Sequence, residues 1–485
     1  MAERTHSIRY NFLMNFILTA AQFVFPLISF PYVSRVLLSE GTGRVAFVSA
    51  VANYFLMIAS LGIPTYGIRA CAQVRDDRLS LSRTAQELFF INALMTCLSL
   101  FAFFLSLCLI PRFREESGLF FVYSFSILLN LFGMNWLFQA LEKYDYITLR
   151  SLILGLLSIV LIFLFVRRRG DVLRYALILV FSSSAANVLN LFLLPRYISL
   201  RPLGDYHFKR HFRPILILFS QSLVVSLYTN MDTVMLGFLR DSRELGLYNA
   251  SVRLKGVLLS LVTSLGNVLL PRMSYYAKRE RREEFLMLAG KAVNFTLFLS
   301  LPLALYFIAY AEETIRFLAG PDFSAAAPAM RCMAGAVTAI GLTAVLGVQV
   351  LTAEGRESRV LISVIAGAAA DFLLNLLLIP GLGAFGAALA TLVTEYLVLM
   401  VQLVFTRNYL PYLLRNFRGQ RFLLSALLAL LPALLVKGLS LSLFFRLALS
   451  AFLYFGSYAV IQLLLREEFV LLALSALKKI SHRKS

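Results

Sequence analysis

Three charged residues lie inside long apolar segments on either side of a short charged turn. Asp232 precedes the turn, and Arg253 and Lys255 follow it within the stretch from Asn230 to Lys255. A charge in the hydrocarbon core of a bilayer costs about 3 kcal/mol on insertion scales, so such residues usually face protein or a watery cavity. Arginine presents a planar fork of donors to a phosphate, and lysine acts as a point charge. This stretch is therefore a candidate for a polar site at membrane depth.

Asp232 and Arg253 are expected at similar depths, because Arg253 lies roughly 10 Å into its segment at 1.5 Å per residue. Asp232 would then be the charge partner that holds Arg253 when no ligand is bound. The alternatives are a purely structural salt bridge, or snorkelling of Arg253 and Lys255 toward the outer surface. Two residues apart on a helix, the two cations point about 200° from each other. The two cations are therefore not expected to reach the same anionic group together.

Other polar residues in the apolar segments have two interpretations each. Arg35, after the first segment, is either a cation that lines a cavity or an interfacial anchor. Asn53 and Asn230 are either groups that line a cavity or partners in interhelical hydrogen bonds. The acids Asp371 and Glu395 do not favour an anionic ligand. They would either bind a proton or Na⁺, which couples movement to an ion gradient, or bond to neighbouring helices.

Composition places the chain in a membrane. It has 485 residues, 59% hydrophobic and 15% charged, with a mean hydropathy of +0.78. A soluble protein carries about 25% charged residues. The net charge of +20 resides in short loops between apolar runs. It is therefore expected to set topology and to meet anionic membrane lipids, and no nucleic-acid partner is expected.

The predicted fold is an all-α polytopic membrane protein with about 14 transmembrane helices, because a span needs about 20 apolar residues. Loops are short, and no soluble domain is inserted. The candidate spans are 11–34, 44–63, 86–110, 118–139, 147–166, 172–195, 213–238, 246–270, 289–310, 325–351, 359–379, 383–405, 421–441 and 444–465.

The distribution of basic residues predicts the orientation. With the N-terminus inside, most of the 46 Lys and Arg residues fall on the cytoplasmic side, as the positive-inside rule requires. The run from Arg167 to Arg169 is the contrary loop. Both termini are then cytoplasmic. The stretch Met1–Tyr10 is short and polar, so no cleavable signal peptide is expected.

Two segments of the chain repeat each other. Glu40-Gly41-Thr42-Gly43 opens one span that closes with Ser-Leu-Gly, and Glu244-Leu245-Gly246 opens another that closes in the same way. An even number of spans separates them, which predicts parallel repeats. The expected division is a lobe at 1–200, a lobe at 201–410 and two extra helices with a basic tail at 411–485. Chance similarity among apolar segments is the alternative.

The first span carries Pro26 and Pro31, each of which removes a backbone hydrogen bond. The helix should bend there, either as a static packing kink or as a hinge that moves. The four cysteines form no Cys-x-x-Cys pair, and the four histidines lie outside the apolar segments, so no disulfide and no metal site is expected. No phosphate-binding Gly-x-x-x-x-Gly-Lys-Ser/Thr motif occurs, and ATP hydrolysis is not expected.

Several stretches resemble one family. PYVSRVLLSEGTG, followed by SLGIPTYGIR, resembles the start of the Wzx-type flippases of lipid-linked oligosaccharides. MDTVMLGFL with ELGLYNASVRL resembles their seventh and eighth spans, and LAGPDFSAAAPAMR the loop before their tenth. The family belongs to the multidrug/oligosaccharidyl-lipid/polysaccharide exporter superfamily. The resemblance implies two pseudo-symmetric six-helix lobes, as in multidrug and toxin extruders, around a cavity that opens alternately to each side.

The resemblance also implies the substrate, an undecaprenyl-pyrophosphate-linked oligosaccharide moved to the outer leaflet of the bacterial inner membrane. No bond is made or broken, no cofactor is expected, and a monomer is sufficient. Other polysaccharide-assembly membrane proteins are possible partners. The alternatives are a multidrug or cation antiporter of the same fold, a lipid II flippase, and a membrane glycosyltransferase. The last usually carries a large outer loop, which this chain lacks.

Overall fold

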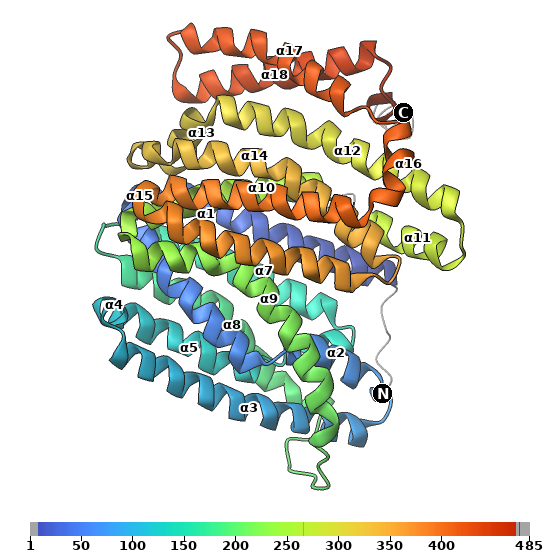
Figure 1. Cartoon of the computed structure of the whole chain (residues 1–485). Helices are drawn as coiled ribbons and strands as arrows, with labels where there is room; N and C mark the ends of the chain where they lie inside the picture. The colour runs from blue at the N-terminus through green and yellow to red at the C-terminus, as the bar shows by residue number, and fades with distance from the viewer. Residues whose placement is uncertain (1–7, 265, 472–474, 476–485) are drawn as a thin grey trace, which may run out of the picture. The chain divides into compact units, whose positions relative to one another are not determined.

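The computed structural model describes residues 8–264, 266–471 and 475, and every regular element in these residues is helical (Figure 1). This confirms the predicted fold class. The predicted N-terminal and C-terminal tails, and Leu265 of the second repeat, lie outside the described residues. Contacts divide the chain into two compact units, Met1–Gly246 and Leu247–Ser485.

The first unit is built from a bundle of long helices joined by short ones. Its helices are α1 (Ile8–Ser60), α2 (Ile63–Ala72), α3 (Arg78–Leu109), α4 (Pro111–Glu115), α5 (Ser117–Gly133), α6 (Asn135–Ala140), α7 (Tyr144–Phe165), α8 (Val172–Tyr197), α9 (Lys209–Leu239) and the start of α10 (Ser242–Thr263).

The second unit continues from α10. Its further elements are α11 (Gly266–Lys278), α12 (Arg282–Ala309), α13 (Ala311–Ala319), the 3₁₀ turn η1 (Pro321–Ala326), α14 (Ala327–Thr343), the π-helix η2 (Ala344–Thr352), α15 (Glu357–Phe405), the 3₁₀ turn η3 (Arg407–Tyr409), α16 (Leu410–Arg415), α17 (Gly419–Leu435), the 3₁₀ turn η4 (Val436–Gly438) and α18 (Leu443–Leu464).

Two helices are long enough to cross a bilayer twice. Within the described residues, 12 helices are long and apolar enough to span a membrane. Two of these, α1 with its continuation and α15, extend over 59 and 49 residues, and each contains a non-helical residue, Leu38 or Gly383. Leu38 and Gly383 fall at or beside connections predicted between successive spans. The count of about 14 spans stays a prediction.

A hydrophobic core joins the short helices of the first unit. Trp136 of α6 packs against α2, where a Cβ added to Gly67 would lie 2.7 Å from the indole ring. Leu88 of α3 and Ile215 of α9 are fully buried in the same cluster. The core thus fixes the first turns of α9 against α2 and α3.

Helices α17 and α18 lie beside α12 in the second unit (Figure 1), and tyrosines attach them to it. The Tyr310 hydroxyl, just beyond α12, donates to the carbonyl of Ala433 at 2.5 Å. The Tyr458 hydroxyl donates to the carbonyl of Phe298 at 3.0 Å. The contacts therefore place α17 and α18 within the second unit. The predicted division at 200/201 and 410/411 concerns the repeat, and it stays a prediction.

The contrary basic loop is tied to one carboxylate. The side chain of Asp171 accepts hydrogen bonds from the backbone N–H groups of Arg167 and Arg168 at 2.9 and 2.8 Å, and from Arg174 at 2.8 Å. These donors stabilise the charged form and lower the pKa of Asp171 below its ordinary value. The bond network therefore strengthens the connection between α7 and α8 at neutral pH and weakens as pH falls.

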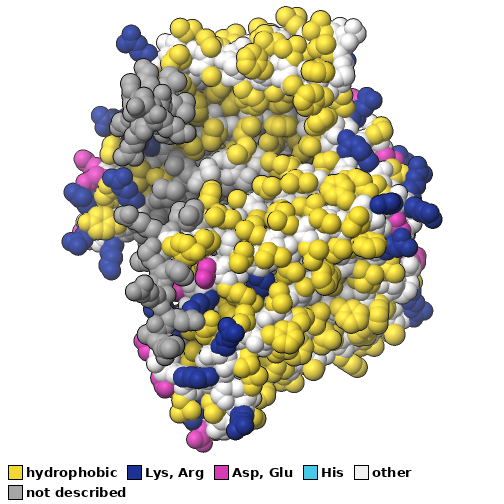
Figure 2. All heavy atoms as spheres, turned by 180° about the vertical axis from the view of Figure 1, so that it is seen from behind, with side chains coloured by type: hydrophobic (Ala, Val, Ile, Leu, Met, Phe, Trp, Pro, Cys, Tyr) yellow, Lys and Arg dark blue, Asp and Glu magenta, His cyan; other side chains and the backbone are white. Residues whose placement is uncertain are grey.

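The surface is that of a membrane protein. Many large hydrophobic side chains are exposed, among them Phe101, Phe192 and Leu377, which are at least 70% exposed. Figure 2 shows hydrophobic side chains over most of one face, with Lys and Arg gathered toward its edges. Burying such surface in hydrocarbon is favourable, whereas exposing it to water is not. The chain is a multi-pass membrane protein.

Candidate functional site

The kink in α1 lies next to the first predicted site residue. Leu38 adopts φ 59° and ψ −176°, which interrupts the helix three residues after Arg35. Arg35 is exposed, and its guanidinium donates to the carbonyl of Pro31 at 2.5 Å. Pro26 is exposed and Pro31 is half-buried in the same half of α1. The prolines therefore lie within the helix that the kink ends.

The middle of α9 is exposed although it carries polar side chains. Only 6% of its most apolar window is buried. The hydroxyls of Ser220, Ser222 and Thr229 each donate to the carbonyl four residues earlier, which satisfies them within the helix. A polar exposed stretch at membrane depth is expected to line water, because lipid offers no hydrogen bonds. Of the polar residues in this part of α9, the sequence predicts Asn230 and Asp232 as site residues.

Asn230, Asp232 and Asn53 differ in their surroundings. Asn230 is half-buried, and its amide donates to the carbonyl of Ser226 at 3.2 Å. Asp232, two residues further along α9, is 7% exposed. Asn53 of α1 is exposed. The polar stretch of α9 thus ends at a buried carboxylate.

The predicted cations of α10 belong to the second unit. Arg253 is exposed and Lys255 is half-buried. Asp232 lies in the first unit. The pairing of Asp232 with Arg253 therefore stays a prediction.

The two predicted acids of α15 lie on opposite sides of its kink. Asp371 is 2% exposed, and it accepts a hydrogen bond from Asn375, one turn later, at 3.0 Å. Glu395 is 7% exposed and follows the kink at Gly383. Among the described residues, no three His, Cys, Asp or Glu side chains gather into a group that could hold a metal ion. The structure thus joins Asp371 to Asn375, which can serve as one element of an ion site.

The repeated motifs meet in a reciprocal backbone contact. A Cβ added to Gly43 of α1 would overlap the carbonyl oxygen of Ser242, and one added to Gly246 would overlap the carbonyl oxygen of Ser39. The two serines and the two glycines are each 203 residues apart in the sequence (242 − 39 and 246 − 43). In the repeat predicted from the sequence, the members of each pair are equivalent positions. Only glycine permits this approach.

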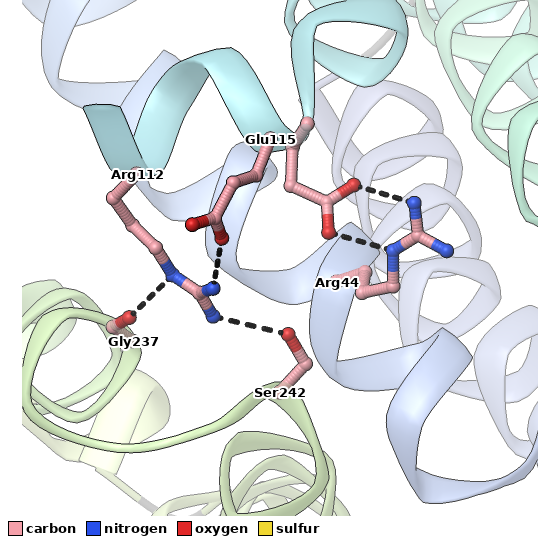
Figure 3. Close-up of polar contacts among 6 residues, drawn as sticks. Arg44, Arg112, Glu115, Gly237 and Ser242 are labelled. Carbon is pink, nitrogen blue, oxygen red and sulfur yellow. Dashed lines mark hydrogen bonds and ion pairs between the residues drawn. The ribbon is translucent and has the colours of Figure 1, made fainter. Parts of the chain in front are cut away.

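Figure 3 shows two ion pairs that involve neighbours of these contact residues. Arg44, next to Gly43, forms a bidentate pair with Glu116 through bonds of 2.6 and 2.8 Å. Arg112 of α4 pairs with Glu115 and donates at 3.3 Å to the carbonyl of Gly237 at the end of α9. Its guanidinium also donates at 3.3 Å to the Ser242 hydroxyl. Arg112 thus ties α4 to the turn between α9 and α10.

Aromatic rings fill the space beside these ion pairs. Phe47 of α1 lies 5.9 Å from Phe113 and 5.4 Å from Phe238, measured between ring centroids. A Cβ added to Gly237 would overlap the Phe47 ring. The rings, the ion pairs and the glycine contact all lie at the turn between α9 and α10 in the first unit. We call this set, formed by Gly43, Arg44, Phe47, Arg112, Glu116, Gly237, Ser242 and Gly246, the glycine closure.

Sequence reasoning missed the charges of the glycine closure. Arg112 and Glu116 fall between predicted spans, and no local pattern connects them with Arg44. His211 lies before the apolar run of α9, as expected, but it is 1% exposed, because α9 begins at Lys209 and its first turn packs into the core.

Known proteins share both the sequence pattern and the fold. A family model described as "Polysaccharide biosynthesis protein" matches residues 8–277. "Putative O-antigen transporter" of Escherichia coli (strain K12) is 24% identical over 410 residues, which are 83% of this chain and 97% of that protein.

Two solved structures have the same fold. "Lipid II flippase MurJ, inward closed conformation" matches with a TM-score of 0.73 at 15% identity, over 94% of this chain and 100% of that one. An inward-facing multidrug resistance MATE family transporter matches with a TM-score of 0.61 at 12% identity, over 81% of this chain and 96% of that one.

Proposed function

This chain belongs to the polysaccharide biosynthesis protein family, and we propose that it moves an undecaprenyl-pyrophosphate-linked oligosaccharide from the cytoplasmic to the outer leaflet of the bacterial inner membrane. The observation that carries the proposal is α9, a span whose middle is exposed and polar. Such a span suits the passage of a polar head group through hydrocarbon. The relative named as an O-antigen transporter, which this chain matches over 97% of its length, supports the same substrate class.

The substrate has three parts that need different surroundings. Its pyrophosphate is anionic and its glycan is polar, so neither crosses hydrocarbon unaided. Arg35 and Arg253 are the proposed phosphate ligands, and Lys255 contributes charge from another side of α10. Asn53 and Asn230 are proposed to face the glycan. The polyprenyl tail remains in lipid.

Asp232 is the proposed partner of Arg253 between transport events. A carboxylate lowers the cost of keeping a guanidinium away from bulk water, and it is replaced when a phosphate arrives. This exchange would keep the binding cation in place and prevent it from turning toward the membrane surface. Specificity for one glycan would come from polar side chains scattered over the cavity.

Alternating access would use the kinked helices and the glycine closure. With the N-terminus in the cytoplasm, as the positive-inside rule predicts, Leu38 and the α9–α10 turn face outward. The glycine closure is then the closed outer end of the path. Bending at Pro26 and Pro31 would accompany its opening, because prolines leave carbonyls free in the helix. No chemical bond changes, so the chain acts as a transporter with no cofactor.

Ion coupling is proposed for the acids of α15. Asp371 and Glu395 are buried carboxylates that can bind a proton or Na⁺. In proteoliposomes, a coupling-ion gradient that supplies about 1.4 kcal/mol is expected to raise the initial rate of translocation about tenfold, because this free energy corresponds to a factor of about ten. Asp371→Asn should abolish this dependence, and the rate measured when no gradient is imposed should stay unchanged. Equal rates with and without proton and Na⁺ gradients would refute coupling.

A multidrug or cation antiporter is the second candidate, because the chain shares its fold with a MATE family transporter and a shared fold does not identify the substrate. A lipid II flippase is a candidate for the same reason. Deletion of the chain in its source cell separates them. The proposal predicts that intact undecaprenyl-linked repeat units accumulate, with normal peptidoglycan. New sensitivity to cationic drugs with normal glycan export would favour the antiporter, and loss of peptidoglycan synthesis would favour lipid II.

A further inference from the structure

A pocket of the second unit lies where several of its helices begin or end. It has a volume of about 590 Å³ and lies between the last turn of α11, the first turn of α12, the turn that precedes α15 and the 3₁₀ turn η3. The glycine closure and the proposed transport path use none of the residues that line it. We call it the tyrosine pocket, and its main polar residues are Tyr276, Lys278, Arg282, Glu354, Arg356 and Tyr409.

Tyr409 is the buried centre of the tyrosine pocket, at 5% exposure. Its hydroxyl donates to the carboxylate of Glu354 at 2.8 Å and accepts a hydrogen bond from Arg356 Nη1 at 3.1 Å. The same nitrogen lies 3.3 Å from Glu354 Oε2, so Arg356 balances the charge of Glu354. A guanidinium has five N–H donors on three nitrogens. Among the described residues, the side-chain polar contacts of Arg356 involve Nη1 alone, which leaves Nε and Nη2 available to a ligand.

Two further cations line the pocket. The Arg282 guanidinium, on an exposed side chain, lies 5.8 Å from the centroid of the Tyr409 ring. A guanidinium placed over a ring keeps its in-plane N–H groups for another acceptor, such as a phosphate. Lys278 is half-buried at the end of α11, and its side chain forms no ion pair within the described part of the chain. Glu280 is the remaining acid of the lining, and it is exposed.

The Tyr276 ring adds positive charge beside the pocket. The guanidinium groups of Arg272 and Arg281 lie 5.7 and 5.8 Å from its centroid, and Arg272 Nε donates to its hydroxyl at 3.2 Å. Arg281 is paired with Glu284 at 3.1 Å. After the ion pair around Tyr409 is discounted, the lining keeps two cations and one exposed acid. With Arg272 beside them, these cations favour an anion that accepts several hydrogen bonds, as a phosphate group does.

The pocket lies at the depth of lipid head groups. Arg282 is the first residue of one candidate span, Arg282–Ala309, and η3 follows the end of another, Glu357–Phe405. Met287 lies five residues further along α12, or roughly 7.5 Å at 1.5 Å per residue, and it is 60% exposed. An acyl chain attached to a phosphate in the pocket would reach this apolar surface. The positive-inside rule predicts the cytoplasmic side for this end of the helices, where the leaflet is anionic.

We propose that the tyrosine pocket binds the phosphate group of an anionic phospholipid from the surrounding membrane. Arg282 and Arg356 are the phosphate ligands, Lys278 contributes charge, and the acyl chains lie on the apolar surface of α12. Because these cations come from separate elements, the bound lipid connects α11 and α12 with the turn before α15. The lipid stays in its own leaflet, so the proposal does not depend on the proposed function.

Photo-crosslinking to the purified full chain in lipid nanodiscs tests this site. The probe is phosphatidylglycerol with a photoactivatable group on its head group, and mass spectrometry identifies the crosslinked peptides. Crosslinks are expected in the α11–α12 turn and in the turn before α15. Unlabelled phosphatidylglycerol should protect these peptides, whereas phosphatidylcholine, which has no net charge, should not. Crosslinking should decrease at high salt, because salt screens the attraction between exposed charges.

A double variant removes two of the proposed charges. When Lys278→Gln and Arg282→Gln are combined, the mole fraction of probe that gives half-maximal crosslinking should rise at least about tenfold, since each cation near an anionic membrane surface contributes about fivefold in affinity. The matched control combines Lys209→Gln and Arg421→Gln. These substitutions remove the same charge from exposed positions predicted on the same side of the membrane, so crosslinking should match that of the parent chain.

Several results would overturn the proposal. Equal protection by phosphatidylcholine or unchanged crosslinking in the double variant would show that the cations of the pocket do not select a lipid. Competition by inorganic phosphate would make a soluble phosphate compound the ligand instead. Stronger protection by a polyprenyl pyrophosphate would assign the pocket to the transported lipid. The competition and salt experiments use the parent chain, so they are decisive even if the double variant does not fold.

Discussion

Replacing Arg253 by alanine is expected to lower the initial rate of lipid-linked oligosaccharide translocation by about tenfold to a hundredfold. A hydrogen bond to a charged group contributes about 1.5–3 kcal/mol, and a phosphate ligand loses at least one such bond on truncation. Arg253→Lys should retain part of the rate, because lysine keeps the charge but not the planar fork. The measurement is translocation in proteoliposomes at matched amounts of protein.

Arg243→Ala is the matched control for Arg253→Ala. Arg243 is an exposed arginine near the start of the same helix, so its loss changes net charge equally. A second variant in the same experiment replaces the proposed charge partner. Asp232→Asn should change substrate affinity with little loss of folded protein. Loss of expression in Asp232→Asn, together with a normal rate in Arg253→Ala, would show that both residues are only structural.

Gly246→Ala is expected to prevent the glycine closure. The added methyl group would overlap the Ser39 carbonyl, which is backbone and cannot turn aside. Overpacking of this kind costs about 1–3 kcal/mol, which shifts a two-state equilibrium by about fivefold to somewhat more than a hundredfold. A cysteine at Ser39, a 2% exposed position, should then react at least about fivefold faster with a membrane-impermeant maleimide. Gly43→Ala should behave in the same way, because its added methyl group would overlap the Ser242 carbonyl.

Gly256→Ala is the control, because it lies on the same helix and a Cβ there meets nothing within 4 Å. It should label at the parent rate. If Gly246→Ala and Gly256→Ala labelled equally slowly, the close approach would have no role in closing the path. Faster labelling from the cytoplasmic side alone would contradict the proposed orientation instead.

The fold follows from the sequence to a large extent. Apolar length set the positions of the helices, and the expected connection between the first two spans falls at Leu38, where α1 leaves helical geometry. The basic loop at Arg167 was the weak part of the topology, yet helices form on both sides of it, at α7 and α8. Apolar length is local information, which explains why these features are predictable.

The candidate site was less accessible from the sequence. Arg44 and Glu116 are 72 residues apart, so no local spacing connects them. The hydroxyls of α9 were overlooked, because a serine within a span is usually satisfied by its own helix and does not by itself signal a cavity. The motifs that predict the repeat contain Gly43 and Gly246, but nothing in those motifs predicts that each glycine approaches a backbone carbonyl.

The most direct test of the central claim is translocation by the purified chain in liposomes. A short-chain polyprenyl-pyrophosphate oligosaccharide is incorporated into one leaflet, and a lectin that cannot cross the membrane reports its arrival in the other. The account predicts transfer that requires the chain, falls with Arg253→Ala and is unaffected by Arg243→Ala. Transfer at the protein-free rate, in vesicles where the chain is folded and correctly oriented, would contradict it.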